Sequence, residues 1–222
     1  MHSDVEVLAD PAPVAKAGAD FVAERARTAV ADHGQFHFAV SGGHTPWQMF
    51  AELAGEEVPW AQVVIYQVDE RVAPDGDPAR NLTHLRASLG DAPAEVRAMP
   101  VGAPDLEAAA DEYAALLPDR FDLVHLGLGP DGHTASLVPG DPVLDVTDRL
   151  VAVTAPYQEH RRMTLTYPAL ARADQLLWLV TGEDKRRPLA QVLAGDPSVP
   201  GGRVVAARSL VLCDTAAGGD AG

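Results

Sequence analysis

The chain has 222 residues, enough for one large or two small domains with a substantial buried core. Its hydrophobic content of 47% is typical of a globular protein and excludes a disordered one. The net charge of −15 argues against a general nucleic-acid binder, because such a protein needs a basic face.

The first half of the chain alternates strands and helices. Residues 5–9 are predicted to form a strand. Residues 11–33 are predicted to form a helix, with proline in its first turn and Gly34 as its end. The remaining elements of this half are strands at residues 36–40 and 63–68 and helices at 47–54, 79–89 and 105–117.

The second half begins with an apolar run at residues 121–126, which is typical of a buried strand in a parallel sheet. Two further strands at 150–154 and 163–166 have no helix between them. We therefore expect them to run antiparallel to the rest, in a minor lobe near residues 140–175. The last predicted elements are a strand at 176–181, a helix at 183–194 and a strand at 209–213.

This alternation predicts an α/β protein with a mainly parallel open sheet and helices on both faces. We expect a single domain over residues 1–215 and a disordered tail over 216–222. The single cysteine, Cys213, excludes an intrachain disulfide and a cysteine-based zinc site. No export signal and no bilayer-length apolar run is found, so the expected location is cytoplasmic, without a membrane partner.

A glycine-rich turn, LGLGPDGHTASLVPG at residues 126–140, follows the buried strand. Ligands of open α/β sheets bind just beyond the carboxyl ends of strands, so we expect the active site here. The imidazole of His133 is suited to proton transfer at neutral pH, and Asp131 is near enough to orient it. The alternative is a loop histidine in a purely structural hydrogen bond. His125 is predicted to be a core residue, and Ser136 to bond within the turn.

The same turn matches the dinucleotide-binding pattern through Gly127, Gly129 and Gly132. That pattern requires a helix of several turns whose N-terminus faces a pyrophosphate. Pro139 and Pro142 would end any helix after about two turns, which favours the acid–base interpretation over a nucleotide site. No metal-ligand spacing is present among the histidines, so we expect no metal.

A second glycine-rich segment, SGGHTP at residues 41–46, joins a predicted strand to a helix. Converging N–H groups, hydroxyl donors and a helix N-terminus are the parts of a phosphate cradle, here without a Walker lysine. The alternative is an ordinary turn in which Thr45 caps the helix.

Basic side chains near other predicted strand ends could add positive charge. In Asp69-Glu70-Arg71, the guanidinium can form a fork with a phosphate or carboxylate, although a surface charge triplet is the alternative. Arg161, Arg162 and Lys185 could contribute as well, but each taken alone is more often a solvated surface charge.

Together these motifs resemble the 6-phosphogluconolactonase family. The matching blocks are SGGHTP at 41–46, DER at 69–71 with Asn81 downstream, GLGPDGHTASLVPG at 127–140, RMTLT at 162–166, TGEDK at 181–185, and Asp214. The resemblance implies the fold shared with sugar-phosphate isomerases and glucosamine-6-phosphate deaminases. It also implies hydrolysis of 6-phosphoglucono-1,5-lactone in the pentose phosphate pathway, without metal or organic cofactor.

The resemblance also implies the site. His133 would be the general base beside Asp131. The chain departs from the family in two places: the family usually has serine or arginine where this chain has His44, and it often has a lysine near the position of Tyr157. The expected partner is a small sugar-phosphate lactone bound by a monomer or weak homo-oligomer, with no nucleic acid. The expected substrate-binding residues are Ser41, Gly42, Gly43, His44, Thr45, Asp69, Arg71, Asn81, Gly129, Gly132, Arg162 and Lys185.

Two rival functions remain open at this point. A deaminase of the same fold would continue after the glycine–histidine pair with Ile-Ala-Phe-Asn-Glu, whereas this chain continues with Thr-Ala-Ser-Leu-Val. A non-catalytic sugar-phosphate sensor would have no need of both Asp131 and His133.

Overall fold

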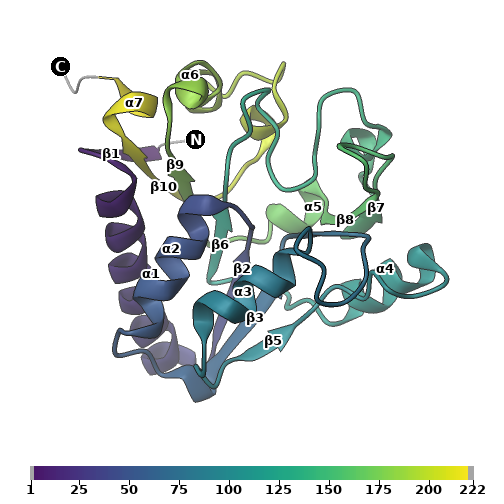
Figure 1. Cartoon of the computed structure of the whole chain (residues 1–222), viewed down its shortest axis with the longest axis horizontal. Coiled ribbons are helices and arrows are strands. Elements are labelled where there is room, and N and C mark those ends of the chain that lie inside the picture. The colour runs from purple at the N-terminus through teal and green to yellow at the C-terminus, as the bar shows by residue number, and fades with distance from the viewer. Residues whose placement is uncertain (1–2, 220–222) are drawn as a thin grey trace.

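A parallel sheet of seven strands forms the centre of the molecule (Figure 1). The structure is a computed structural model and describes residues 3–219; residues 1–2 and 220–222, which belong to the predicted domain and tail, lie outside the described part. The strands are Ser3–Leu8 (β1), Phe36–Val40 (β2), Val63–Gln67 (β3), Glu95–Arg97 (β5), Leu123–Leu126 (β6), Gln175–Val180 (β9) and Arg208–Asp214 (β10). Their order is β1-β10-β9-β6-β2-β3-β5, so the predicted α/β fold class is confirmed.

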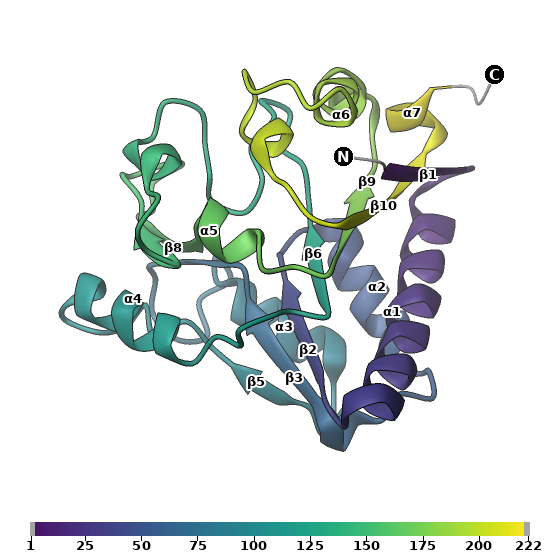
Figure 2. The same ribbon diagram turned by 180° about the vertical axis from the view of Figure 1, so that it is seen from behind.

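A second, antiparallel sheet lies beside the first (Figure 2). Its strands are Asp69–Arg71 (β4), Val151–Val153 (β7) and Arg162–Leu165 (β8), in the order β4-β8-β7. The two predicted strands are therefore confirmed, but they run antiparallel to each other in a sheet of their own and not as antiparallel members of the main sheet. Residues 69–71 are a strand and not merely the end of the preceding one. Val68 still bonds to β2 through its N–H and to Leu165 through its carbonyl, which passes the chain from one sheet to the other.

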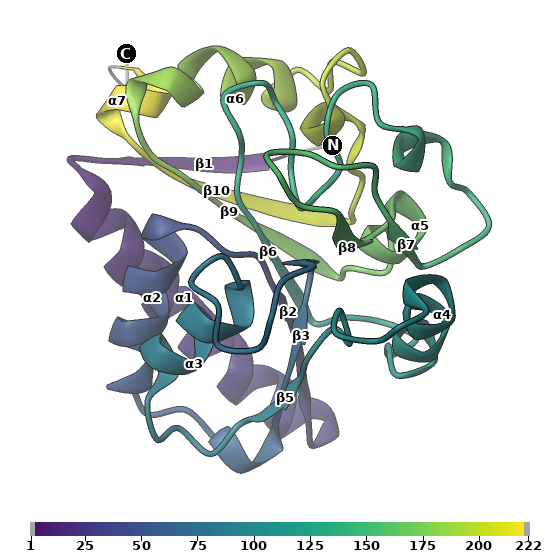
Figure 3. The same ribbon diagram turned by 45° about the vertical axis from the view of Figure 1, so that its right-hand side comes forward.

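Helices cover both faces of the parallel sheet. Pro11–His33 (α1), His44–Ala54 (α2) and Asn81–Leu89 (α3) share one apolar cluster with the strands. Leu106–Ala115 (α4), Tyr167–Leu170 (α5) and Arg186–Leu193 (α6) share the other cluster with the small sheet (Figure 3). The bounds of α1 agree with the prediction, and Gly34 caps it in the left-handed conformation, with φ 88°.

Other elements also differ from the sequence prediction. The β5 strand, three residues at the sheet edge, is too short to show a periodic pattern. The predicted helix at 183–194 begins with a separate 3₁₀ turn, Glu183–Lys185. The tail predicted to be disordered from 216 instead starts with a short helix, Thr215–Gly218 (α7), because the Asp214 carboxylate accepts the N–H of Ala217 at 2.8 Å.

The connections of β2 and β6 create a crevice. These strands are neighbours, but the chain runs from β2 to β3 on one side and from β6 to β9 on the other. Loops that leave two adjacent parallel strands in opposite directions leave space between them at the carboxyl edge, where ligands of such sheets bind. Among the described residues, no helix is both long and apolar enough to cross a bilayer.

Candidate active site

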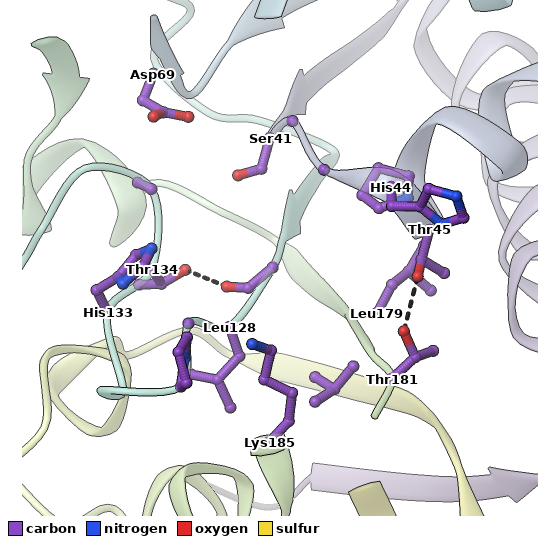
Figure 4. A pocket seen from close by; sticks show the side chains of 18 of the residues that line it. Ser41, His44, Thr45, Asp69, Leu128, His133, Thr134, Leu179, Thr181 and Lys185 are labelled. Carbon is purple, nitrogen blue, oxygen red and sulfur yellow. Dashed lines mark hydrogen bonds between the residues drawn. The ribbon is translucent and has the colours of Figure 1, made fainter. Parts of the chain in front are cut away.

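A cleft of about 440 Å³ opens at the carboxyl edge of the parallel sheet (Figure 4). Its walls are the loops that follow β2, β6 and β9, together with β4 and β8 of the small sheet. Twelve of the fourteen predicted site residues line this one cleft: Ser41, Gly42, Gly43, His44, Thr45, Asp69, Arg71, Asn81, Gly129, His133, Arg162 and Lys185. Asp131 and Gly132 are not among the lining residues.

His133 and Asp131 form a hydrogen-bonded pair. Nδ1 of His133 lies 2.5 Å from Oδ1 of Asp131, and the same oxygen accepts the backbone N–H of His133 at 3.2 Å. Burial opposes ionisation of Asp131, but the adjacent His133 outweighs it and lowers the pKa of the carboxyl. Asp131 therefore carries a charge that can hold the ring in one tautomer through Nδ1, which leaves Nε2 outside this pair.

The glycines of this turn have different tasks. A Cβ on Gly129 would overlap the imidazole of His133 and lie 2.8 Å from Oδ1 of Asp131, so only glycine leaves room for the pair. Gly132 was predicted to bind substrate, but it has φ 81° and its Cα faces Val199, 2.6 Å from where a Cβ would lie. It serves the turn and not the cleft. The first helical segment after it is the 3₁₀ turn Pro142–Asp145, so the helix required by the dinucleotide pattern is absent there.

The segment at 41–46 meets the N-terminus of α2. The helix starts at His44, three residues earlier than predicted, and Gly43 precedes it without a side-chain cap. Its first N–H groups are therefore available to an anion. Thr45 does not cap the helix; its hydroxyl shares a 2.8 Å hydrogen bond with Thr181 after β9. The cradle interpretation thus fits the geometry better than the capped turn.

The charged residues at 69–71 form a strand of the small sheet, so their side chains point alternately to its two faces. Asp69 and Arg71 lie on the cleft side, whereas Glu70 points to the other side and accepts the N–H groups of Asn81 at 2.7 Å and Leu82 at 2.9 Å. Glu70 is fully buried, so the alternative of a surface charge triplet is wrong. Asn81 in turn donates its side-chain amide to the carbonyl of Asp69 at 3.0 Å.

Three buried polar atoms on the cleft have no hydrogen-bond partner within residues 3–219: Oγ of Ser41, Nε of Arg71 and Nε of Arg162. Buried polar groups are nearly always paired, so such atoms at one cleft indicate a missing polar ligand. Burial lowers the pKa of Arg162, and the nearby Arg71 adds to this effect against the opposing influence of Asp69. Arg71 and Arg162 are paired positions of β4 and β8, and two guanidinium groups from such a pair favour an anion between them.

Ser136 connects the glycine-rich turn to the small sheet. Its hydroxyl donates to Oδ2 of Asp69 at 2.6 Å and accepts Nη1 of Arg162 at 3.5 Å. The prediction that it bonds within its own turn was therefore wrong. The physical reason is that β4 packs directly against the turn, which a local sequence pattern cannot reveal.

Lys185 enters the cleft from the turn after β9. Its Nζ lies 2.6 Å from Oδ2 of Asp184, which also lines the cleft and which the sequence reasoning missed. Both oxygens of Asp214 accept the N–H of Gly182 at 3.0 Å and so anchor this turn. Arg161, in contrast, is exposed and does not line the cleft. The sequence reasoning also did not assign Thr134 and Thr181 to the site, although both lie within the matching blocks at 127–140 and 181–185.

His125 lies beneath the cleft as a core residue, as predicted. It is fully buried, and its Nδ1 accepts the backbone N–H of Ser41 at 3.3 Å. Burial lowers its pKa to about 3, so the ring is neutral at physiological pH. Within residues 3–219, no three His, Cys, Asp or Glu side chains are grouped as metal ligands would be.

Comparisons with known proteins show similarity to 6-phosphogluconolactonases and to the family that contains them. The family model described as glucosamine-6-phosphate isomerases/6-phosphogluconolactonase matches residues 9–212. A 6-phosphogluconolactonase from Nostoc sp. is 35% identical over 87% of this chain and 86% of its own. One from Streptomyces coelicolor is 33% identical over 98% and 92%. The crystal structure of a 6-phosphogluconolactonase from Shewanella baltica superposes with a TM-score of 0.87 at 26% identity, covering 96% and 98% of the two chains.

Proposed function

The chain belongs to the glucosamine-6-phosphate isomerase/6-phosphogluconolactonase family and is an enzyme of the lactonase kind, and we propose His133-assisted hydrolysis of 6-phosphoglucono-1,5-lactone. The product is 6-phosphogluconate, in the oxidative branch of the pentose phosphate pathway. One observation carries the mechanism: the imidazole of His133 and the unpartnered donors of Arg71 and Arg162 line the same cleft.

The chemical step needs a base and a stabilised oxyanion. Neutral His133, held through Nδ1 by Asp131, removes a proton from water as the water oxygen attacks the C1 carbonyl. Donors on the cleft wall stabilise the negative charge that develops on the carbonyl oxygen. The imidazolium then returns the proton to the departing ring oxygen. Asp131 stays charged throughout and stabilises the imidazolium.

The phosphate end of the substrate supplies orientation. Two anion sites are available to it: the free N–H groups at the start of α2, and the guanidinium groups of Arg71 and Arg162. Lys185 adds positive charge to the same cleft. Binding the phosphate dianion here converts binding energy into correct placement of C1 beside the base.

The test follows lactone opening above its spontaneous rate in the wild type and in His133→Ala. Loss of a general base lowers kcat by about 10²- to 10⁴-fold. His33→Ala is the matched control, because His33 also pairs with an aspartate, Asp122 at 2.9 Å, but does not line the cleft. We expect the control to keep the wild-type kcat, whereas full turnover by His133→Ala would rule out this residue as the base.

The family description also includes amino-sugar phosphate isomerases, so deamination of glucosamine 6-phosphate is the second candidate. Its expected motif after the glycine–histidine pair is absent here, where Thr134 follows His133. Ammonia release from glucosamine 6-phosphate in place of lactone opening would favour this candidate.

A further inference from the structure

Tyr157 contacts three of the groups to which we assign the reaction. It lies in the hairpin between β7 and β8, and its hydroxyl donates to Oδ2 of Asp131 at 3.3 Å. Its ring meets the imidazole of His133 edge to face, with the centroids 5.8 Å apart and the planes at 68°. The guanidinium of Arg162 lies 5.0 Å from the centre of the same ring. Tyr157 is partly exposed and is not among the residues that line the cleft, so it acts on the cleft only through these contacts.

The hairpin turn holds Tyr157 in a defined place. Tyr157 and His160 exchange backbone hydrogen bonds of 2.9 and 3.3 Å around two residues, Gln158 and Glu159, with φ of 46° and 71°. Two consecutive positive φ values describe a tight hairpin turn, which usually contains glycine or asparagine. Such strained conformations persist where the surrounding structure fixes them, and they gather at functional sites.

The side chain of Gln158 connects Tyr157 to Arg162. Its Nε2 donates to the hydroxyl of Tyr157 at 3.4 Å, and its Oε1 accepts Nη2 of Arg162 at 3.3 Å. Hydrogen bonds therefore run from Arg162 through Gln158 and Tyr157 to Asp131. Each of these hydrogen bonds is long, but the ring of Tyr157 also contacts His133 and Arg162 directly. The ring thus provides a second connection between the acid–base pair and Arg162.

We propose that Tyr157 is a positioning residue that holds the Asp131–His133 pair and Arg162 in one arrangement, an inference that rests on the proposed function. Its hydroxyl fixes the carboxylate oxygen that His133 does not use. Its ring sets the distance between the base and the anion-binding guanidinium. Burial and the carboxylate of Asp131 raise the pKa of Tyr157, so the hydroxyl stays protonated as a donor at neutral pH.

The two halves of the side chain have separable effects. Tyr157→Phe removes the hydroxyl and keeps the ring, so we expect kcat to fall by about 3- to 10-fold with KM within about 2-fold of the wild type. Tyr157→Leu also removes the ring and frees Arg162, so KM should rise by about 3- to 5-fold in addition.

Tyr167→Phe is the matched control. Tyr167 donates its hydroxyl to the carbonyl of Pro200 at 3.0 Å and has the guanidinium of Arg203 at 4.7 Å from its ring centre, but it does not line or support the cleft. Steady-state kinetics on the lactone should show the wild-type kcat and KM for this variant. Equal losses in the Tyr167 and Tyr157 variants would overturn the proposal, because they would indicate general destabilisation.

Failure of this proposal can be told from failure of the proposed function. If kcat and KM of both Tyr157 variants stay within about 2-fold of the wild type while His133→Ala is inactive, Tyr157 does not position the site. If the wild type does not open the lactone at all, the proposed function fails, and the ¹⁵N chemical shifts of the His133 imidazole decide on Tyr157. A change at Nδ1 in Tyr157→Phe, absent in Tyr167→Phe, supports positioning; unchanged shifts overturn it.

Discussion

At the scale of single residues, the site depends on two glycines, whose lack of a side chain makes room for neighbouring side chains. The imidazole of His133 occupies the space in which a Cβ of Gly129 would lie, and the amide of Asn81 occupies the space in which a Cβ of Gly42 would lie. Neither glycine needs a left-handed backbone for this, because neither has a positive φ. Their role is to let another residue approach closely.

Gly129→Ala tests this role. The added methyl group must displace the His133 imidazole or the Asp131 carboxylate, so we expect kcat to fall by about 100-fold, as misplacement of a reacting group by about 1 Å does. The melting temperature should change little, because Gly129 does not have a positive φ and alanine can adopt its backbone conformation. Kinetics and thermal unfolding measure the two effects.

Gly102→Ala serves as the control for this substitution, because a Cβ at Gly102 would meet no atom within 4 Å. It should match the wild type in both measurements. An active Gly129→Ala enzyme would show that the pair tolerates displacement and is not held as closely as the structure indicates.

At the scale of secondary structure elements, Glu70 joins the small sheet to α3. Its Oε1 accepts the N–H groups of Arg71 and Asn81 at 2.8 and 2.7 Å, and its Oε2 accepts the N–H of Leu82 at 2.9 Å. A carboxylate at this place satisfies free donors of the helix N-terminus and interacts favourably with its dipole. Arg80, the residue before the helix, supplies no cap itself but forms an ion pair with Glu70 at 3.0 Å.

Glu70→Ala should therefore destabilise the fold by about 3–5 kcal/mol, because it leaves buried donors and the Arg80 guanidinium without their acceptor. The free energy of unfolding in urea measures this loss. Glu95→Ala is the control: its ion pair with Arg97 is exposed on the Glu95 side, so a change below about 1 kcal/mol is expected. An equal loss in both variants would contradict the capping role.

At the scale of the whole molecule, two apolar clusters pack on opposite faces of the parallel sheet, and His125 is buried in its central strand β6. Its ring is nearly perpendicular to that of Phe50 of α2, with the centroids 6.1 Å apart and the planes at 85°. The histidine supports the backbone of Ser41 from within the core, so the stability of the molecule depends on that ring staying neutral.

This burial makes the stability of the molecule depend on pH. The pKa of His125 is lowered to about 3 in the folded state, whereas the unfolded chain takes up the proton near the ordinary value of 6.5. Between those two values the unfolded state binds more protons, so the stabilising effect is present above pH 6.5 and falls on acidification. The loss approaches about 1.4 kcal/mol per pH unit.

The measurement is the free energy of unfolding in urea between pH 7 and pH 4.5. His125→Asn keeps an acceptor for the Ser41 N–H, lowers stability at every pH because it leaves a cavity, and should flatten the pH dependence. His33→Asn, at a half-exposed position, is the control and should keep the wild-type slope. A wild-type slope in His125→Asn would show that other groups cause the acid sensitivity.

Much of this protein was predictable from local sequence. The proline near the start and Gly34 at the end of α1 are signals within a few residues, so the helix bounds agree with the prediction. Apolar runs that end in glycines marked the carboxyl ends of β2 and β6, and the rule that ligands bind there led to Ser41 and His133 in one cleft. Periodicity, capping and turn chemistry act between neighbours along the chain, and sequence alone therefore determined them.

Tertiary structure decided the contacts between distant segments. Ser136 bonds to Asp69, 67 residues away, and not within its own turn. Gly132 faces Val199 and not the cleft, and Tyr157 reaches Asp131 across 26 residues. The three-residue strands β4 and β5 exist because a neighbouring strand supplies their hydrogen bonds, not because of their own composition. Such pairings are selected by the packing of the whole chain, and no local pattern contains them.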